Sequence, residues 1–258
     1  MILEKIGAAT RIRVEKQKEI LPLNMLREQA EKTEAKQGKS FYQALTGEEM
    51  AFICEVKKAS PSKGIIAKEF PYLEIAREYE EAGAAAISCL TEPEFFLGKD
   101  AYLRKISSQV SIPVLRKDFT IDEYQIYEAK VLGAGAVLLI CSLLEEKTLA
   151  RYLEIVRSLG LSALVEAHDR EEIQMALQAG AQIIGVNNRN LKDFTVSPHN
   201  CLALRSYVPG DKVFVAESGI RTREEVKLLE EAGVSAVLIG ETLMRSPDKK
   251  AMLRELRG

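Results

Sequence analysis

Charged and amide side chains stand at the ends of the apolar runs of this sequence. Glu55 and Lys57 follow AFIC with one residue between them, a spacing that puts both on one face of a strand. An ammonium beside a carboxylate can donate and accept protons, the chemistry of general acid–base catalysis. Because buried charges are costly unless paired, such a cluster is either an ion-pair network or an active site. The candidate catalytic residues are Glu55, Lys57, Lys117, Glu166, Asn187 and Glu217.

Glycines at the ends of two later runs predict an anion site. Ser218-Gly219-Ile220 and Gly240-Glu241-Thr242 each follow an apolar run and precede a helical pattern. Glycine lets main-chain N–H groups approach a phosphate, and a helix N-terminus adds partial positive charge. Ser60 and Arg189 can supply further contacts. The alternative is that both glycines only form turns.

Aromatic side chains lie in two of the loops that follow the apolar runs. Phe95 and Phe96 occur in TEPEFFLGKD, and Phe119 follows LRKD. Aromatic rings in such loops suit a flat or aromatic ligand, and packing of the loops against a barrel is the equal alternative.

A recurring phrase in the sequence predicts the secondary-structure elements that must position these residues. The phrase consists of an amphipathic charged segment, a glycine and a short apolar run. Glycine after a helix supplies the left-handed residue that ends it, and an apolar run indicates a strand buried on both faces. With four similar runs the sequence predicts eight β–α units and therefore a (β/α)₈ barrel. An open dinucleotide-binding sheet is disfavoured, because the one GxG, at Gly133 and Gly135, precedes a strand instead of following one. The phrase occurs at 82–90, 132–140, 179–187 and 232–240, and the further runs at 51–56, 112–118, 162–167 and 212–218.

The segment before the first predicted strand has helical patterns over 3–20 and 22–34 and then the polar residues QGKS. It holds too little apolar material for a domain of its own. We therefore expect one domain over 1–258, in which 1–47 is an N-terminal helical extension packed on the barrel.

Composition narrows the class of protein further. The 258 residues carry 36 Lys and Arg against 38 Asp and Glu, which disfavours a nucleic-acid partner. The apolar runs are too short for a membrane span, and the charged N-terminus lacks a signal peptide's apolar region. Four scattered cysteines and two histidines show no metal-ligand spacing. We expect a cytoplasmic protein without metal or other cofactor, a monomer or weak homodimer.

The motifs, taken together, resemble those of the indole-3-glycerol-phosphate synthase family of tryptophan biosynthesis. The resemblance covers nearly the whole chain in register, including MILEKI and LPL near the N-terminus, although Trp is absent. The family has the (β/α)₈ fold, in agreement with the strand count. The motifs that carry the resemblance are EVKKASPSKG, PVLRKDF, IDEYQIYEA, LVEAHD, IIGVNNRNL, AESGI and AVLIGETLM.

The resemblance implies a carboxy-lyase that converts 1-(2-carboxyphenylamino)-1-deoxyribulose 5-phosphate to indole-3-glycerol phosphate, carbon dioxide and water without a cofactor. It makes Lys117 the general acid, Glu166 the general base and Lys57 a second lysine that contacts the substrate. The same resemblance places three further residues at supporting positions of the active site: Glu55, Asn187 and Glu217. Phe96 and Phe119 fall near the anthranilate ring, and the residues at or next to the phosphate and substrate contacts are Ser60, Arg189, Ser218, Gly219, Gly240 and Glu241.

This chemistry leads to an expectation about the pKa of Lys117 and another about the pKa of Glu166. Three other functions remain as alternatives. Lys117 donates a proton more readily if burial and neighbours lower its pKa, and Glu166 is a better base if its pKa is raised. One rival is a class I aldolase with a Schiff base on Lys117. A second is an isomerase of phosphoribosyl anthranilate, for which the chain offers lysines where paired acids are usual. The third is a barrel that binds a sugar phosphate without catalysis.

Overall fold

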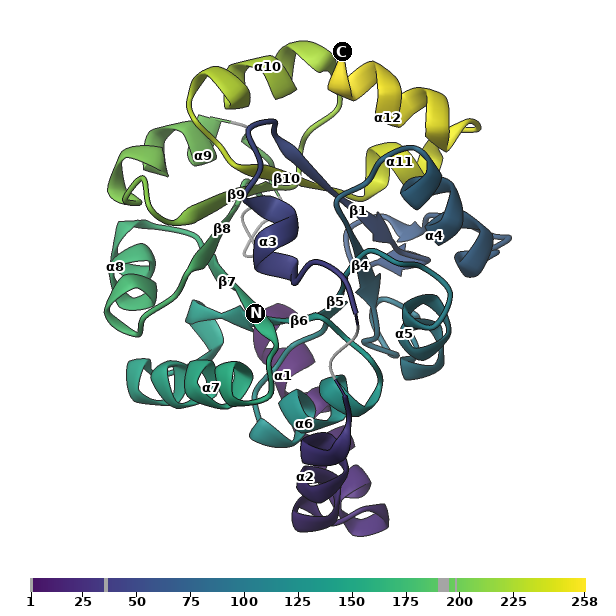
Figure 1. Ribbon diagram of the computed structural model, residues 1–258, viewed down its shortest axis with the longest axis vertical. Helices are drawn as coiled ribbons and strands as arrows, with labels where there is room; N and C mark the ends of the chain where they lie inside the picture. The colour runs from purple at the N-terminus through teal and green to yellow at the C-terminus, as the bar shows by residue number, and fades with distance from the viewer. Residues whose placement is uncertain (1, 35–36, 190–194, 198) are drawn as a thin grey trace.

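A computed structural model describes residues 2–34, 37–189, 195–197 and 199–258 of the protein. Eight parallel strands close into a barrel with the order β1-β10-β9-β8-β7-β6-β5-β4, and helices surround it (Figure 1). The predicted (β/α)₈ fold is therefore confirmed. The barrel strands are β1 (Ala51–Val56), β4 (Ala86–Leu90), β5 (Val114–Lys117), β6 (Ala136–Ile140), β7 (Ser162–Ala167), β8 (Ile183–Asn187), β9 (Val213–Glu217) and β10 (Ala236–Ile239).

Each strand is followed by a helix or helical turn that covers the outside of the barrel. The glycine of every repeated phrase has a positive φ, between 72° and 89°, and ends the preceding helix as expected. The outer elements are α4 (Tyr72–Glu81), α5 (Asp100–Ser107), α6 (Glu123–Val131), η1 (Cys141–Leu143), α7 (Glu146–Ser158), α8 (Arg170–Gln178), α9 (His199–Leu204), η2 (Arg205–Tyr207), α10 (Arg223–Glu231), α11 (Glu241–Arg245) and α12 (Lys249–Arg257).

A short hairpin interrupts the pattern after the first strand. β2 (Ala59–Ser60) pairs with β3 (Gly64–Ile65) in antiparallel fashion. The sequence patterns do not predict it, because two-residue strands are too short to show a hydrophobic period.

Three helices precede the barrel in the segment that we expect to be an N-terminal extension, residues 1–47, of which 1, 35 and 36 lie outside the described residues. They are α1 (Ile2–Ile20), α2 (Leu23–Lys32) and α3 (Phe41–Leu45). α1 and α2 pack against α6. In the described part of the chain, every helix is too short or too polar to span a lipid bilayer.

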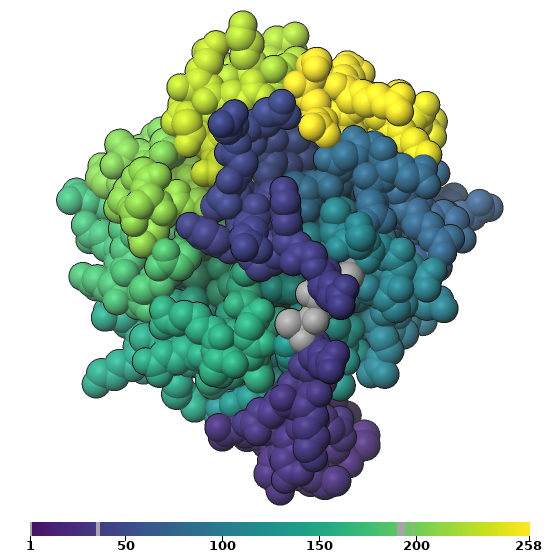
Figure 2. Space-filling model, viewed as in Figure 1, coloured from purple at the N-terminus to yellow at the C-terminus, as the bar shows by residue number. Residues whose placement is uncertain are grey.

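The third helix fills one end of the barrel. Ser40, read from the sequence as part of a polar stretch, caps α3 by accepting a hydrogen bond from the main chain of Gln43. Phe41 and Leu45 are fully buried against the apolar residues inside the barrel. Figures 1 and 2 look onto this end, where α3 lies across the centre of the ring of strands. The N-terminal ends of the strands are thereby covered.

Alternate residues of each strand point inward and stack in layers along the barrel axis. The lower layers are apolar, with Ile53, Leu115 and Leu164 among them. Continuing the same alternation toward the C-terminal ends reaches the charged residues. Thus Glu55 lies above Ile53, Lys117 above Leu115 and Glu166 above Leu164. The candidate site is the last inward-facing layer of a packed core.

Candidate active site

A pocket of about 520 Å³ opens at the C-terminal ends of the strands. The structure brings every predicted site residue to its lining. From the strands and the residues next to them come Glu55, Lys57, Lys117, Glu166, Asn187 and Glu217, and from the loops come Ser60, Phe96, Phe119, Arg189, Ser218, Gly219, Gly240 and Glu241.

Lys117 stands between two carboxyl groups at the centre of this cluster. Its Nζ lies 3.6 Å from Oε2 of Glu166 on β7 and 3.6 Å from Oε2 of Glu217 on β9. Asn187, on the strand between them, donates from Nδ2 to Oε1 of Glu166 at 3.3 Å. Lys117 is therefore placed to exchange a proton with either carboxyl group.

A second ion pair joins Glu55 and Lys57 at the end of β1. The expectation that both share one face is met in the structure. Two glycines make room for the carboxylates. A Cβ at Gly240 would collide with Oε1 of Glu55, and one at Gly185 would collide with Oε1 of Glu217. Gly240, predicted as part of a phosphate site, thus also leaves room for the Glu55 side chain at the end of β1.

The expectation of a lowered pKa for Lys117 is wrong. Burial by itself lowers the pKa of a lysine, but the carboxyl groups of Glu217, Glu166 and Glu55 outweigh it and raise the pKa. Lys117 is consequently an ammonium ion throughout the physiological pH range.

The expectation of a raised pKa for Glu166 is also wrong, and Glu217 has that property instead. Burial favours the neutral form of both groups. For Glu166, the charge of Lys117 and the contacts with His168 and Asn187 outweigh burial and bring the pKa to about 2. For Glu217, burial and the negative charges of Glu166 and Glu55 prevail over Lys117 and raise the pKa to about 8. Of the two carboxyl groups, Glu217 is therefore the one that binds a proton more readily.

The loops after β9 and β10, where the sequence predicts an anion site, both reach the pocket. Ser218 has a φ of 68°, a left-handed conformation that is strained for a residue with a side chain, and Gly219 follows with 80°. Asn188 holds the turn by donating to the Ser218 carbonyl at 3.0 Å. Main-chain N–H groups in the first turn of α11 have no partners within that helix. Glu241 and Thr242 of this turn line the pocket together with Gly219 and Gly240.

The side chain of Glu241 is engaged elsewhere. Its Oε1 accepts from Nε of Arg245 at 3.0 Å and lies 3.6 Å from Nζ of Lys63, and these cations help to hold its pKa below the usual value against the effect of burial. A contact of Glu241 with phosphate would therefore come from its main chain.

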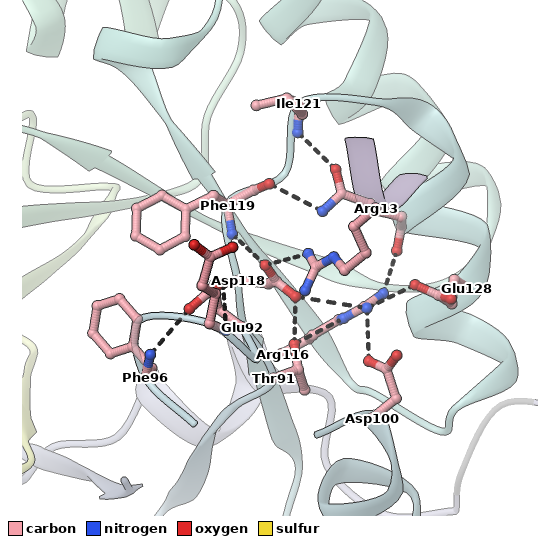
Figure 3. Close-up of polar contacts among 12 residues, drawn as sticks. Arg13, Thr91, Glu92, Phe96, Asp100, Arg116, Asp118, Phe119, Ile121 and Glu128 are labelled. Atoms are coloured by element: carbon pink, nitrogen blue, oxygen red, sulfur yellow. Dashed lines mark hydrogen bonds and ion pairs between the residues drawn. The ribbon is translucent and has the colours of Figure 1, made fainter. Parts of the chain in front are cut away.

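A buried carboxylate, that of Glu92, holds the loop that carries Phe96 in the pocket lining. Glu92 accepts hydrogen bonds from the main-chain N–H groups of Glu94, Phe95 and Phe96 at 3.0, 2.7 and 3.0 Å. The Phe96 ring lies 5.8 Å from the Phe119 ring, centroid to centroid. Figure 3 shows both rings on the side of Glu92 away from the charged groups. Phe95 does not line the pocket among the described residues.

A buried ionic network supports the strand end that carries Lys117 (Figure 3). Asp118, only 1% exposed, pairs with Arg13 of α1 at 2.8 Å and accepts from the hydroxyl of Thr91 at 2.6 Å. Arg116 lies 3.7 Å from Asp118 and 2.7 Å from Glu128. Asp118 also accepts from the main chain of Phe119 at 2.8 Å. The network fixes both neighbours of Asp118, which are site residues.

Sequence reasoning missed two contributions to the site. Ile2, Leu3 and Ile6 of α1 form part of the pocket wall, and an apolar helix face gives no hint of which surface it covers. His168 pairs with Glu166, with Nε2 and Oε1 3.3 Å apart. It follows Glu166 at the two-residue spacing that pointed to Glu55 and Lys57, so the same rule could have found it. Over residues 2–34, 37–189, 195–197 and 199–258, no cluster of His, Cys, Asp or Glu is arranged to hold a metal ion.

Fold and site together define a (β/α)₈-barrel enzyme with acid–base groups at its C-terminal mouth. The family model described as indole-3-glycerol phosphate synthase matches residues 3–256. The chain belongs to this family, as its motifs predicted.

Named relatives agree with this assignment, and solved structures agree with the fold. The chain is 57% identical over 258 residues to "Indole-3-glycerol phosphate synthase" of Ruminiclostridium cellulolyticum, covering all of this chain and 99% of the relative. It is 56% identical over 257 residues to the protein of the same name from Endomicrobium trichonymphae, covering 100% of both chains. The structure of 3-hexulose-6-phosphate synthase from Salmonella typhimurium matches with a TM-score of 0.66 and 12% identity, over 81% of this chain and 97% of that one. At that identity the likeness concerns the fold alone.

Proposed function

We propose that Lys117 is the general acid and Glu166 the general base with which this protein makes indole-3-glycerol phosphate. The observation that carries the proposal is the position of Lys117, whose ammonium lies 3.6 Å from the carboxyl groups of both Glu166 and Glu217. Proton donor and acceptor thus meet over a pocket of a size suited to one substrate molecule.

Ring closure forms a bond between the aryl carbon that bears the carboxylate and the ketone carbon of the substrate. Negative charge develops on the ketone oxygen, and Lys117 protonates it. A raised pKa does not prevent this, because an alkoxide is a stronger base than an amine. Glu217, whose raised pKa favours its protonated form, can then donate the proton that restores the ammonium.

Loss of carbon dioxide restores the aromatic ring, and loss of water completes the indole. The departing hydroxyl takes a proton from the restored ammonium of Lys117 and leaves as water, while the anilinic nitrogen gives one up. Glu166, ionised at neutral pH, accepts the anilinic proton. Lys57 is placed to hold the substrate carboxylate before it leaves, because its ammonium faces the same pocket.

The remaining site residues hold the two ends of the substrate. The phosphate would lie on the main chain of Ser218, Gly219, Gly240 and Glu241, with Ser60 and Arg189 as further contacts. The aromatic end would lie against Phe96 and Phe119. Binding at both ends fixes the reacting atoms with energy gained away from them.

The surroundings of Lys117 favour this reaction over that of a class I aldolase. A Schiff base requires the neutral amine of the lysine, whereas three carboxyl groups keep Lys117 in its ammonium form. The biosynthetic activity of the family, together with the near balance of charge, supports a cytoplasmic enzyme, monomeric or weakly dimeric, whose partner is a phosphorylated small molecule and not a nucleic acid or membrane.

The test is to mix the protein with 1-(2-carboxyphenylamino)-1-deoxyribulose 5-phosphate and follow indole fluorescence. The chain contains no Trp, so its own emission is low. Appearance of indole with matching loss of substrate supports the proposal. Binding without turnover would indicate a non-catalytic barrel, and trapping of Lys117 by borohydride with a sugar phosphate would indicate an aldolase.

A further inference from the structure

His168 occupies a position between two carboxylates at the edge of the site. Its Nε2 lies 3.3 Å from Oε1 of Glu166, and its Nδ1 lies 3.0 Å from Oε2 of Glu172 on α8. Oε2 of Glu172 also accepts from the main-chain N–H of His168 at 2.8 Å. Both ring nitrogens thus face a carboxylate oxygen, and the imidazole spans the gap between β7 and α8.

The Nε2 atom is buried and has no hydrogen-bond partner among the described residues, so its ion pair with Glu166 is what compensates its burial. The side chain as a whole is 20% exposed. The ring is not part of the pocket lining, which means that it would act on the substrate through Glu166 and not directly.

We propose that His168 is a positioning residue for the reaction: its imidazole, fixed by Glu172, orients the Glu166 carboxylate and keeps it in the ionised form that accepts a proton. The inference rests on the proposed role of Glu166 as the general base.

Electrostatics support the geometry. Burial lowers the pKa of a histidine, but the contacts with Glu166 and Glu172 and their negative charges outweigh it and raise the pKa of His168 to about 10. An imidazolium carries an N–H on both nitrogens, so it can donate from Nδ1 to Glu172 while its positive charge faces Glu166. Its positive charge in turn contributes to the low pKa of Glu166.

Other charged and titratable groups surround this pair. Glu166 faces Lys117 of β5, Glu217 of β9 and the amide of Asn187. On the other side, the thiol of Cys141 in η1 lies 3.5 Å from the main-chain carbonyl oxygen of Glu172, and burial together with Glu172, Glu166 and Asp169 raises its pKa to about 12. Cys141 therefore stays neutral, and the cations that act on Glu166 are Lys117 and His168.

The kinetic test compares His168→Ala, His168→Gln and Glu172→Gln with two matched controls, His199→Asn and Glu171→Gln. Both control residues are exposed, and His199 is the chain's other histidine. We expect kcat of His168→Ala to fall roughly ten- to a hundredfold, as for other residues that orient a reacting group, and KM to change less than about threefold. Gln retains a donor near the Nε2 position without the charge, so His168→Gln should recover part of kcat.

The pH profile separates positioning from a purely structural role. With the imidazolium gone, the acid limb of the kcat/KM profile should move to higher pH by about one to three units, because an opposite charge near Glu166 has been lost. The limb should move in both His168 variants and not in the controls. Altered stability alone would leave its position unchanged.

Histidine side-chain NMR tests the bridge without any assay of activity. The His199→Asn variant leaves a single histidine signal, which should titrate near pH 10. Its midpoint should fall in Glu172→Gln and in Glu166→Gln. A midpoint near the ordinary value of about 6.5 would overturn the inference.

Different results would contradict the proposed role of Glu166 and the proposed role of His168. If Glu166→Gln keeps full activity, the general base has been wrongly assigned. If Glu166→Gln is inactive while His168→Ala keeps the wild-type kcat and acid limb, the positioning role of His168 is overturned and that of Glu166 stands. Should His168→Ala fail to fold, His168→Gln and Glu172→Gln decide the question.

Discussion

Nζ of Lys117 lies 3.6 Å from the carboxyl group of Glu217, whose pKa is raised to about 8 by burial and by the negative charges of Glu166 and Glu55. The ammonium ion therefore lies between a carboxyl group that binds a proton readily and the ionised Glu166. One proton donor is thus available to Lys117 in a buried layer that also holds the carboxylates of Glu55 and Glu166.

Replacing Lys117 by Ala should reduce kcat about a thousandfold or more, because the proton donor and the charge that stabilises the developing alkoxide are both removed. Circular dichroism should show an unchanged fold. Indole fluorescence under steady-state conditions measures the effect, and activity near that of the wild type would remove Lys117 from the mechanism.

The Glu217→Gln variant should gain stability relative to the wild type as pH rises from 5 to 8. The pKa of Glu217 is raised from 4.5 to about 8, so the folded protein binds more protons than the unfolded chain between these values. Stability of the wild type therefore declines with pH across this window on account of Glu217. Urea unfolding at pH 5 and pH 8 provides the comparison. An equal difference between the two proteins at both pH values would contradict the assigned shift.

Replacing Arg189 by Ala should raise KM about tenfold and change kcat much less, since a phosphate contact is made equally in the ground state and the transition state. Inhibition by inorganic phosphate should weaken by a similar factor. Arg104→Ala, on the exposed face of α5, is the control. An unchanged KM would place Arg189 outside the phosphate site.

The Glu92→Gln variant should bind substrate several-fold more weakly, because an amide cannot accept from all three main-chain N–H groups that now meet the carboxylate. The loop that carries Phe96 would lose its fixed conformation. Glu94→Gln, exposed on the same loop, keeps these bonds and should behave as wild type. The test is the KM of both variants. Equal KM values for Glu92→Gln and Glu94→Gln would show that contacts other than those with Glu92 hold Phe96.

Replacing Arg13 by Ala should lower the free energy of unfolding by about 2 to 3 kcal/mol, since the loss of one partner leaves the buried Asp118 with Arg116 alone. kcat should fall as well, because Asp118 lies between Lys117 and Phe119. Arg11→Ala, exposed on α1, serves as the control. Denaturant unfolding and activity are measured together, and loss of stability with unchanged kcat would confine Arg13 to a role in folding.

Patterns that repeat, or that follow from local geometry, were predictable from the sequence. The eight strands follow from a recurring phrase, and the convergence of Lys117, Glu166 and Glu217 follows from the alternation of side chains along parallel strands. The family assignment rests on motifs that span the chain in register.

The features that could not be predicted are pKa values and packing contacts that depend on distances between segments far apart in the sequence. The pKa of Lys117 was expected to be lowered because burial alone lowers it, but the sum of three carboxyl charges from three other strands reverses the sign. The division of roles between Glu166 and Glu217 depends on His168, whose side chain reaches Glu166 and Glu172 together. The packing of Ile2, Leu3 and Ile6 against the pocket has no local signature.

Gly240, at the end of the last strand, makes room for the Glu55 carboxylate at the end of the first. This contact joins two strands that are synthesised far apart in time. The ribosome makes Glu55 and Lys57 early, but the last barrel strand, which pairs with theirs, comes some 180 residues later. A nascent chain released before that point lacks the neighbour that closes the ring beside the Glu55–Lys57 pair. The closed ring of strands, with β1 and β10 paired beside the Glu55–Lys57 ion pair, can therefore form only after β10 has been synthesised.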